Sequence, residues 1–319
     1  DRVTQAAVAW VLTTVFVRFC EDNALLRPVW ISGPPARRQE ALDAEAAYFR
    51  AHPEDTHREW LLQAIEHLRR TPATAALVDA RSALWTVSPS GRAATALLAV
   101  WRERTEDGEL VRDFADPALD TRFLGDLYQD LSEHAKKTYA LLQTPDFVEE
   151  FILDRTLEPA LAERPLEGFK LIDPACGSGH FLLGAFARFL GRWQRHAPGL
   201  EPRLRVQKAL DAVWGVDINP FAIAIARFRL LLAALHAVGA TSLEGAPGFT
   251  IHVLAGDSLY FSHDQQYLPA LGDDFAYAGE DKGSLLAALN HGQYDAVVAN
   301  PPYITVKDRK LNAAYRERY

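Results

Sequence analysis

The segment 169–181, which reads FKLIDPACGSGHF, contains residues whose types and spacing suit ligand binding. A short apolar run ends at Asp173 and Pro174, and Gly177 and Gly179 follow before a helix begins. Glycine tolerates positive φ and lets backbone N–H groups approach a ligand closely. The segment therefore predicts a strand, a tight turn and a helix start. A Gly-x-Gly turn by itself is a weak signal, because many α/β proteins turn this way for packing alone.

Three further apolar runs along the chain also end in polar residues. They are 213–217, which ends at Asp217, 250–254, which precedes Asp257, and 294–299, which precedes Asn300. Helical patterns at 181–195 and 221–238 indicate two βα units, and hence a parallel sheet with helices on its faces. The carboxyl ends of such strands form the edge where ligands bind. The sequence therefore predicts an α/β fold with a site at that edge.

The rest of the chain is mostly helical in pattern. The expected domains are a helical N-terminal domain over 1–117, a helical connector over 118–168 and the sheet domain over 169–319. The segment 261–293 is polar and aperiodic, so we expect a loop insertion there, to which we assign no chemistry. Within the connector, Thr144 and Pro145 predict a helix start by the N-cap rule, ahead of an amphipathic helix over 147–157.

Composition narrows the class of protein. The formal net charge is −8, so any nucleic-acid surface must be a local patch. The two cysteines, Cys20 and Cys176, form no disulfide framework, which favours a reducing compartment. The apolar run 6–17 has only 12 residues, too few to cross a bilayer. No Cys/His cluster has ligand spacing, so we expect no metal. Methionine is absent even at the first position, and we expect an excerpt of a longer chain.

Three basic features are candidate phosphate contacts. They are the pairs Arg37-Arg38 and Arg69-Arg70, and the tail after residue 303, which carries five basic and two acidic residues. A basic flank beside the polar segment at 300–303 would suit contacts to nucleic-acid phosphates. Solvated helix faces are the alternative for all three.

Taken together, the four turns resemble those of S-adenosylmethionine-dependent methyltransferases. The residues NPPY at 300–303 resemble the catalytic signature of N6-adenine or N4-cytosine DNA methyltransferases, and 124–148 resembles the segment before the first cofactor motif in restriction–modification methyltransferases. More narrowly, DPACGSGHFLLGAFARFL, GVDINPFAIAIARFRLL and NPPYITVKD look like the PglX family of BREX-type phage-defence systems. The resemblance implies a Rossmann-like methyltransferase sheet, incomplete at about four strands, after an all-α domain. It also implies methyl transfer to adenine N6 in DNA.

The resemblance assigns S-adenosyl-L-methionine as the cofactor and gives its contacts. The turn 173–179 would curl around the methionine part, Asp217 would accept hydrogen bonds from the ribose hydroxyls, and Ile218 would pack on the adenine. Asp257 would reach the adenine edge, and Thr144-Pro145 would close over the methionine part. The expected cofactor-binding residues are Thr144, Pro145, Asp173, Pro174, Ala175, Cys176, Gly177, Gly179, Phe181, Asp217, Ile218, Asp257 and Ser258.

The same resemblance makes Asn300, Pro301, Pro302 and Tyr303 the catalytic group. An exocyclic amine is a poor nucleophile because its lone pair is delocalised into the ring. The Asn300 side-chain oxygen and the Pro301 carbonyl would accept hydrogen bonds from the amine and aim its lone pair at the methyl group. The two prolines would fix these acceptors in place. Tyr303 would stack on a base rotated out of the duplex.

Each role has a structural alternative. Asp217, which precedes Asn-Pro, could cap the helix that follows, and Asp257 could form an ordinary turn. His180 fits a residue that orients the turn better than it fits a base. The NPPY segment could be a strand exit stiffened by prolines.

Other functions would use the same groups. An RNA base or a protein glutamine also presents a planar amine. A non-catalytic scaffold would bind the cofactor and recruit defence partners, but the intact Asn300 and Tyr303 argue against it. The resemblance favours double-stranded DNA and other defence proteins as partners, in the cytoplasm and away from membranes. Because the sheet is incomplete, we expect this chain alone to bind cofactor weakly and to select no DNA sequence.

Overall fold

A computed structural model gives the fold of the chain. The residues that it describes are 2–78, 82–116, 118–125, 144–259, 282–290, 292–301, 312, 313 and 316. The chain forms two compact units, one of residues 1–120 with 235–249 and the other of residues 121–234 with 250–319.

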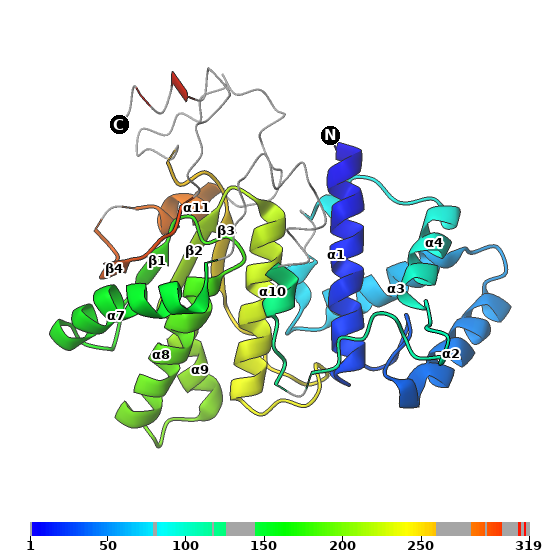
Figure 1. Ribbon diagram of the computed structural model, residues 1–319, viewed down its shortest axis with the longest axis horizontal. Coiled ribbons are helices and arrows are strands. Elements are labelled where there is room, and N and C mark those ends of the chain that lie inside the picture. The colour runs from blue at the N-terminus through cyan, green and yellow to red at the C-terminus, as the bar shows by residue number, and fades with distance from the viewer. Residues whose placement is uncertain are drawn as a thin grey trace. The chain divides into compact units, whose positions relative to one another are not determined.

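The first unit is helical, as the sequence predicts for the N-terminal part of the chain. They are α1 (Arg2–Asp22), α2 (Arg38–Ala51), α3 (His57–Arg70) and α4 (Gly91–Trp101), with short 3-10 turns at Pro35–Arg37, Ala75–Leu77 and Ala83–Trp85 (Figure 1). The start of α3 is set by a capping box, in which Thr56 and Glu59 bond reciprocally to the backbone. The segment 235–249 joins this unit through a bond from the Leu243 amide to the Leu25 carbonyl, at 2.7 Å.

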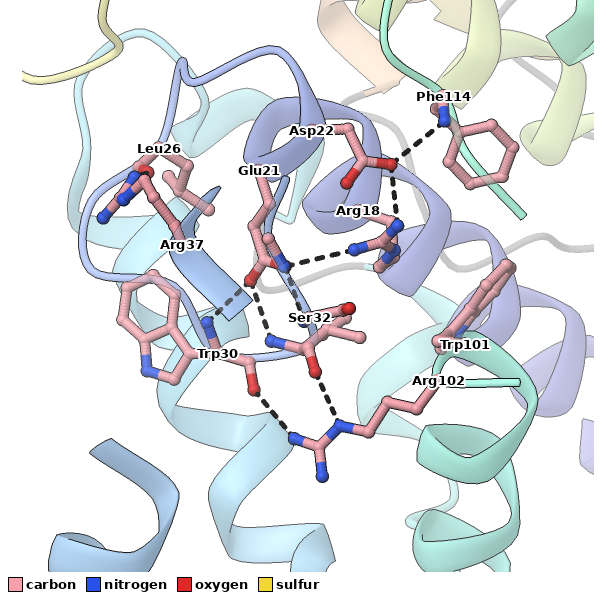
Figure 2. A network of polar contacts seen from close by, with 12 residues as sticks. Arg18, Glu21, Asp22, Leu26, Trp30, Ser32, Arg37, Trp101, Arg102 and Phe114 are labelled. Carbon is pink, nitrogen blue, oxygen red and sulfur yellow. Dashed lines mark hydrogen bonds and ion pairs between the residues drawn. The ribbon is translucent and has the colours of Figure 1, made fainter. Parts of the chain in front are cut away.

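A fully buried carboxylate holds the loop that follows α1. The two oxygens of Glu21 accept hydrogen bonds from the backbone amides of residues 30–33, at 2.7 to 3.0 Å (Figure 2). One turn earlier on α1, Arg18 is also buried and pairs with Asp22 at 2.7 Å. Asp22 in turn accepts the amide of Phe114 at 3.0 Å. The apolar helix α1 therefore uses its few charged residues to hold two loops of the first unit.

Three of the four arginines in the arginine pairs of the first unit, Arg37, Arg69 and Arg70, have acidic partners close by in sequence. Arg37 pairs with Glu40 at 2.6 Å, and Arg69 and Arg70 both bind Glu66. These contacts favour the solvated-face interpretation over phosphate binding.

Within the described part of the chain, two helices are long and apolar enough to cross a bilayer by length and composition alone. They are α1 and α10 (Pro220–Ala237), and 67% and 61% of their apolar windows are buried inside the protein. Core helices pass the same test, and this burial favours that interpretation.

The second unit contains a four-stranded parallel sheet. Its strands are β1 (Leu171–Asp173), β2 (Val213–Asp217), β3 (His252–Ala255) and β4 (Ala296–Val297), in the order β3-β2-β1-β4 (Figure 1). Residue Ile172 of β1 is opposite Trp214 on one side and Val297 on the other. The four strands and their parallel arrangement confirm the sequence prediction.

Helices lie on both faces of the sheet. In chain order they are α7 (Asp146–Glu163), α8 (His180–His196), α9 (Pro202–Asp211), α10 and α11 (Lys282–Ala288). A Cβ at Gly215 would lie 2.6 Å from Leu182 of α8, whereas the next residue, Val216, packs with Leu285 of α11. Because successive strand residues face opposite sides, α8 and α11 cover opposite faces.

Two helices of the second unit are absent from the sequence prediction. The segment 261–293 was expected to be a loop insertion, which is wrong for 282–288, where α11 forms and buries Leu285. Helix α11 has only seven residues, too few for a helical period to stand out. Helix α9 begins with Glu201 as N-cap, whose carboxylate accepts the amides of Arg203 and Leu204.

Candidate functional site

The carboxyl ends of all four strands lie at one edge of the sheet. From β1 the chain proceeds to β2 and β3 on one side, and then to β4 on the other side of β1. The strand order therefore reverses between β1 and β4, which is where open α/β sheets bind ligands. The glycine turn follows β1, and Asn300 lies three residues after β4. A bond from the Val298 amide to the Ile172 carbonyl, at 3.0 Å, holds these two strand ends side by side.

The turn after β1 has the geometry that its glycines predict. Gly177 and Gly179 have φ values of 51° and 85°, which favour glycine. The carboxylate of Asp173 accepts the Ala175 amide at 3.0 Å, and the Gly179 amide donates to the Cys176 carbonyl at 2.8 Å. The turn then leads directly into α8, whose first residues, including Phe181, are buried.

Asp217 at the end of β2 is bonded to the glycine turn. One of its oxygens accepts the Gly177 amide at 2.8 Å, and the other accepts the Asn219 amide at 2.8 Å. The side chain of Asn219, and not that of Asp217, caps α10 by accepting the Phe221 amide at 3.0 Å. Asp217 is thus a half-buried carboxylate that connects two of the predicted motifs, with Ile218, also half-buried, beside it.

Burial changes the pKa of several groups at the turn. It raises the pKa of Asp173, which is 1% exposed, to about 8, with a further rise from the negative charge of Asp217. Burial also raises the pKa of Asp217. Burial and the positive charge of Arg229 lower the pKa of His180 to about 4, so its imidazole is neutral at pH 7. A buried imidazole with so low a pKa is a weak proton acceptor, which suits the orienting role better than that of a base.

Packing explains why glycine follows Trp214 on β2. A Cβ at Gly215 would lie 2.6 Å from a methyl carbon of Leu182 and 3.0 Å from the Cys176 sulfur. The turn and the start of α8 therefore lie directly on the bare backbone of β2. The buried Cys176 has this packing role, and burial raises its pKa, so it remains a thiol.

Asn300 and Thr144 are 156 residues apart in sequence and meet at the site. The Asn300 side-chain Nδ2 donates to the Thr144 Oγ1 at 3.2 Å. Pro145 is the N-cap of α7 and is exposed, as is Pro301. The structure therefore brings together two segments that the sequence assigned to different tasks. Two residues of the predicted catalytic group, Pro302 and Tyr303, lie outside the described residues.

The third strand places Asp257 and Ser258 at the same edge, two and three residues after β3. Asp257 Oδ1 accepts the Leu259 amide at 2.9 Å, which is the turn geometry of the alternative interpretation. Both residues are half-buried. The adenine contact of Asp257 and Ser258 stays a prediction.

The sequence prediction missed Arg229, which holds the glycine turn from α10. This buried guanidinium donates to the Ser178 carbonyl at 2.9 Å and to the Thr121 hydroxyl at 3.2 Å. The available signal was a pair of arginines, Arg227 and Arg229, within an apolar helix, and such a pair fits surface positions equally well. Glu149 of α7 was also missed: its carboxylate occupies the space that a side chain at Gly184 would take. Burial and the charge of Asp146 raise the pKa of Glu149 to about 7.

Comparison with known families identifies this arrangement. Residues 211–319 match the Eco57I restriction-modification methylase family, and residues 155–246 match the MmeI DNA-methyltransferase domain. The chain is 50% identical to the adenine-specific methyltransferase PglX of Streptomyces coelicolor over 339 aligned positions, which cover 100% of this chain. This chain belongs to the PglX family.

This chain is also similar in sequence to restriction–modification methyltransferases. The chain is 30% identical to the Type II methyltransferase M.PaeR7I of Pseudomonas aeruginosa over 175 residues, which cover 54% of this chain and 25% of that protein. The chain spans 28% of the length of the Streptomyces PglX. A solved DNA complex of the restriction-modification enzyme MmeI aligns with 80% of this chain and 37% of its own, at 15% identity, but its TM-score of 0.40 is too low to support an argument.

The site residues fit the S-adenosylmethionine that the PglX resemblance implies. Asp217 presents a half-buried carboxylate at a strand end, a suitable acceptor for the two hydroxyls of a ribose. Asn219 beside it is 2% exposed, and its Nδ2 has no hydrogen-bond partner among the described residues, so it is a donor available to a ligand. The amides of Ala175, Cys176, Gly177 and Gly179 already donate within the protein, so a ligand carboxylate would meet the amides that begin α8.

Proposed function

We propose that this chain carries the cofactor site and catalytic asparagine of an S-adenosylmethionine-dependent DNA methyltransferase that modifies adenine N6. The observation that supports this most directly is the position of Asn300 after β4, beside the glycine turn after β1, at the point where the strand order reverses. Membership of the PglX family supports the substrate class, because the Streptomyces relative is an adenine-specific methyltransferase.

The chain's own residues would position an amine for attack. Asn300 Oδ1 and the Pro301 carbonyl would accept one N–H each from the adenine amine, which moves nitrogen toward tetrahedral geometry. The ring of the exposed Pro301 fixes φ, and the proline that follows in the sequence restricts ψ, so the Pro301 carbonyl keeps its direction. The amine nitrogen would then form a bond to the methyl carbon, and the extra proton on nitrogen would leave to water. When bound, S-adenosylmethionine supplies that methyl group on a sulfonium, a good leaving group.

The cofactor residues would orient the methyl group. Asp217 would hold the ribose, the start of α8 would meet the carboxylate, and Ile218 would pack on the adenine ring. Asp257, Ser258 and Pro145 complete the proposed cofactor contacts; the resemblance adds Thr144, whose hydroxyl bonds Asn300 in this structure. Pro302 and Tyr303 complete the catalytic group, with Tyr303 stacking on a flipped base.

The wider role proposed is that of a host-marking enzyme in a BREX phage-defence system, active in the cytoplasm on double-stranded DNA with other defence proteins as partners. This role rests on the PglX resemblance. We also propose the three-part division at 117/118 and 168/169 and the absence of a metal. Among the described residues, no group of three His, Cys, Asp or Glu side chains could hold a metal ion.

Transfer of a labelled methyl group tests the proposal. The full-length protein is incubated with labelled S-adenosylmethionine and, separately, with duplex DNA, RNA and a protein extract, and the product is digested and identified. The proposal predicts label in N6-methyladenine of the duplex DNA. Label in protein or RNA alone would replace DNA as the substrate, and no label in any of them would favour the cofactor-binding scaffold.

A further inference from the structure

The side-chain amide of Asn300 lies against the hydroxyl of Thr144. The amide nitrogen of Asn300 is the donor and the hydroxyl oxygen of Thr144 is the acceptor, at 3.2 Å. An asparagine side chain has an oxygen that only accepts and a nitrogen that only donates, so occupying the nitrogen leaves the oxygen for another partner. That oxygen is the atom that methyl transfer requires.

The position of Thr144 is fixed by its surroundings. It precedes Pro145, which restricts the backbone of Thr144 to extended conformations. The Pro145 carbonyl accepts the amides of Val148 and Glu149, which locks the start of α7. At the other end of α7, Arg164 pairs with Asp295 at 2.6 Å, immediately before β4. Helix α7 therefore connects Thr144, which precedes its first residue, to β4, the strand that leads to Asn300.

Rotation of an asparagine amide by 180° exchanges its donor and acceptor ends. A threonine hydroxyl can accept from Nδ2 or donate to Oδ1, whereas the substrate amine only donates and therefore takes Oδ1. Thr144 can then accept from Nδ2 and hold the amide plane, which water would leave free to rotate. We propose that Thr144 is a positioning residue for catalysis, which holds Asn300 with Oδ1 facing the substrate amine. This role rests on the proposed function and differs from the cofactor contact that the sequence resemblance assigned to Thr144.

Three substitutions at Thr144 separate the two roles in the full-length protein. Thr144→Val keeps the shape and removes the acceptor, Thr144→Ala removes the acceptor without adding a methyl group at a polar position, and Thr144→Ser retains the hydroxyl. The matched control is Thr156→Val on α7, the helix that follows Thr144, where the hydroxyl donates to the Ile152 carbonyl at 2.7 Å. The measurements are kcat for methylation of duplex DNA and the dissociation constant for S-adenosylmethionine by calorimetry.

The loss of one neutral hydrogen bond corresponds to a fall of roughly five- to tenfold in rate. We expect this fall in kcat for Thr144→Val and Thr144→Ala, with cofactor affinity within about twofold of the wild type. Thr144→Ser and Thr156→Val should both retain kcat. Retained cofactor affinity also shows that the variants are folded.

Two results would overturn the proposal. One is an unchanged kcat in both Thr144→Val and Thr144→Ala. The other is cofactor affinity weakened about tenfold in both variants, with or without a fall in kcat, which would make Thr144 a cofactor contact. The wild-type protein tests the proposed function separately. If the wild type methylates no DNA, the proposed function is wrong. If the wild type and the Thr144 variants are equally active, only the positioning role is wrong.

Discussion

The two glycines of the turn after β1 should respond differently to substitution by alanine. Both Gly177 and Gly179 have left-handed backbones, with φ of 51° and 85°. A Cβ at Gly177 would have no neighbouring atom within 4 Å, whereas at Gly179 it would lie 3.0 Å from Ala226 Cβ and 3.4 Å from Ala226 Cα on α10. Gly177→Ala therefore carries only a conformational cost, and Gly179→Ala adds a steric one.

The structure gives the size of the difference. A non-glycine residue in the left-handed region costs about 1–2 kcal/mol. A side chain forced against the backbone of a packed helix costs about 1–3 kcal/mol more. We expect Gly177→Ala to lower the free energy of unfolding by about 1–2 kcal/mol and Gly179→Ala by about 2–5 kcal/mol.

Thermal unfolding of the two full-length variants, with the wild type beside them, measures this difference. The dissociation constant for S-adenosylmethionine should rise more in Gly179→Ala, because α8 and its first amides would move away from α10. Equal destabilisation of the two variants would refute the contact between the turn and α10. A more severe effect at Gly177 would show that the turn has a different path.

Three further predictions concern buried polar groups. Asp173→Asn should flatten the dependence of stability on pH. Between about pH 4 and pH 8 the Asp173 carboxyl, with its raised pKa, keeps a proton that the unfolded chain releases, so the stability of the wild type falls as pH rises through that window, by at most about 6 kcal/mol. Denaturant unfolding at several pH values measures this slope. Arg229→Met should weaken cofactor binding in calorimetry and lower stability by about 2–3 kcal/mol, because the Ser178 carbonyl loses its donor; unchanged affinity would remove Arg229 from the site. Glu21→Gln should lower the free energy of unfolding by about 3 kcal/mol or more, because four backbone amides lose the carboxylate that they bind, and it should leave the cofactor site unchanged. A variant as stable as the wild type in thermal unfolding would contradict the role of this carboxylate.

Much of the fold follows from local pattern. The strand ends at Asp173 and Asp217 and the helices that follow them are where the sequence places them, because apolar runs, glycines and caps act over a few residues. The helix α11 was missed because its seven residues are stabilised by contacts distant in sequence, in which Leu285 packs with Ile172 and Val216. A short helix of this kind has no periodic signature of its own.

The candidate site was predictable motif by motif, but its internal contacts were not. Sequence placed Gly177, Asp217 and Asn300 at strand ends and could not show that Asp217 bonds the Gly177 amide. It also gave Thr144 a role by resemblance alone, whereas its bond to Asn300 joins residues 156 positions apart. Arg229 was overlooked because a buried arginine and an exposed one look alike in a helical pattern. Such contacts depend on how strands and helices are packed, which no local spacing encodes.

The central claim is that Asn300 presents its acceptor oxygen to an adenine amine at the edge of the sheet. The most direct test is to quantify N6-methyladenine by mass spectrometry in duplex DNA treated with full-length wild-type protein or with Asn300→Ala, alongside calorimetric titration of S-adenosylmethionine. We predict that the variant forms no N6-methyladenine and binds the cofactor within about twofold of the wild type. Continued methylation by Asn300→Ala would contradict the role of Asn300 and the mechanism built on it.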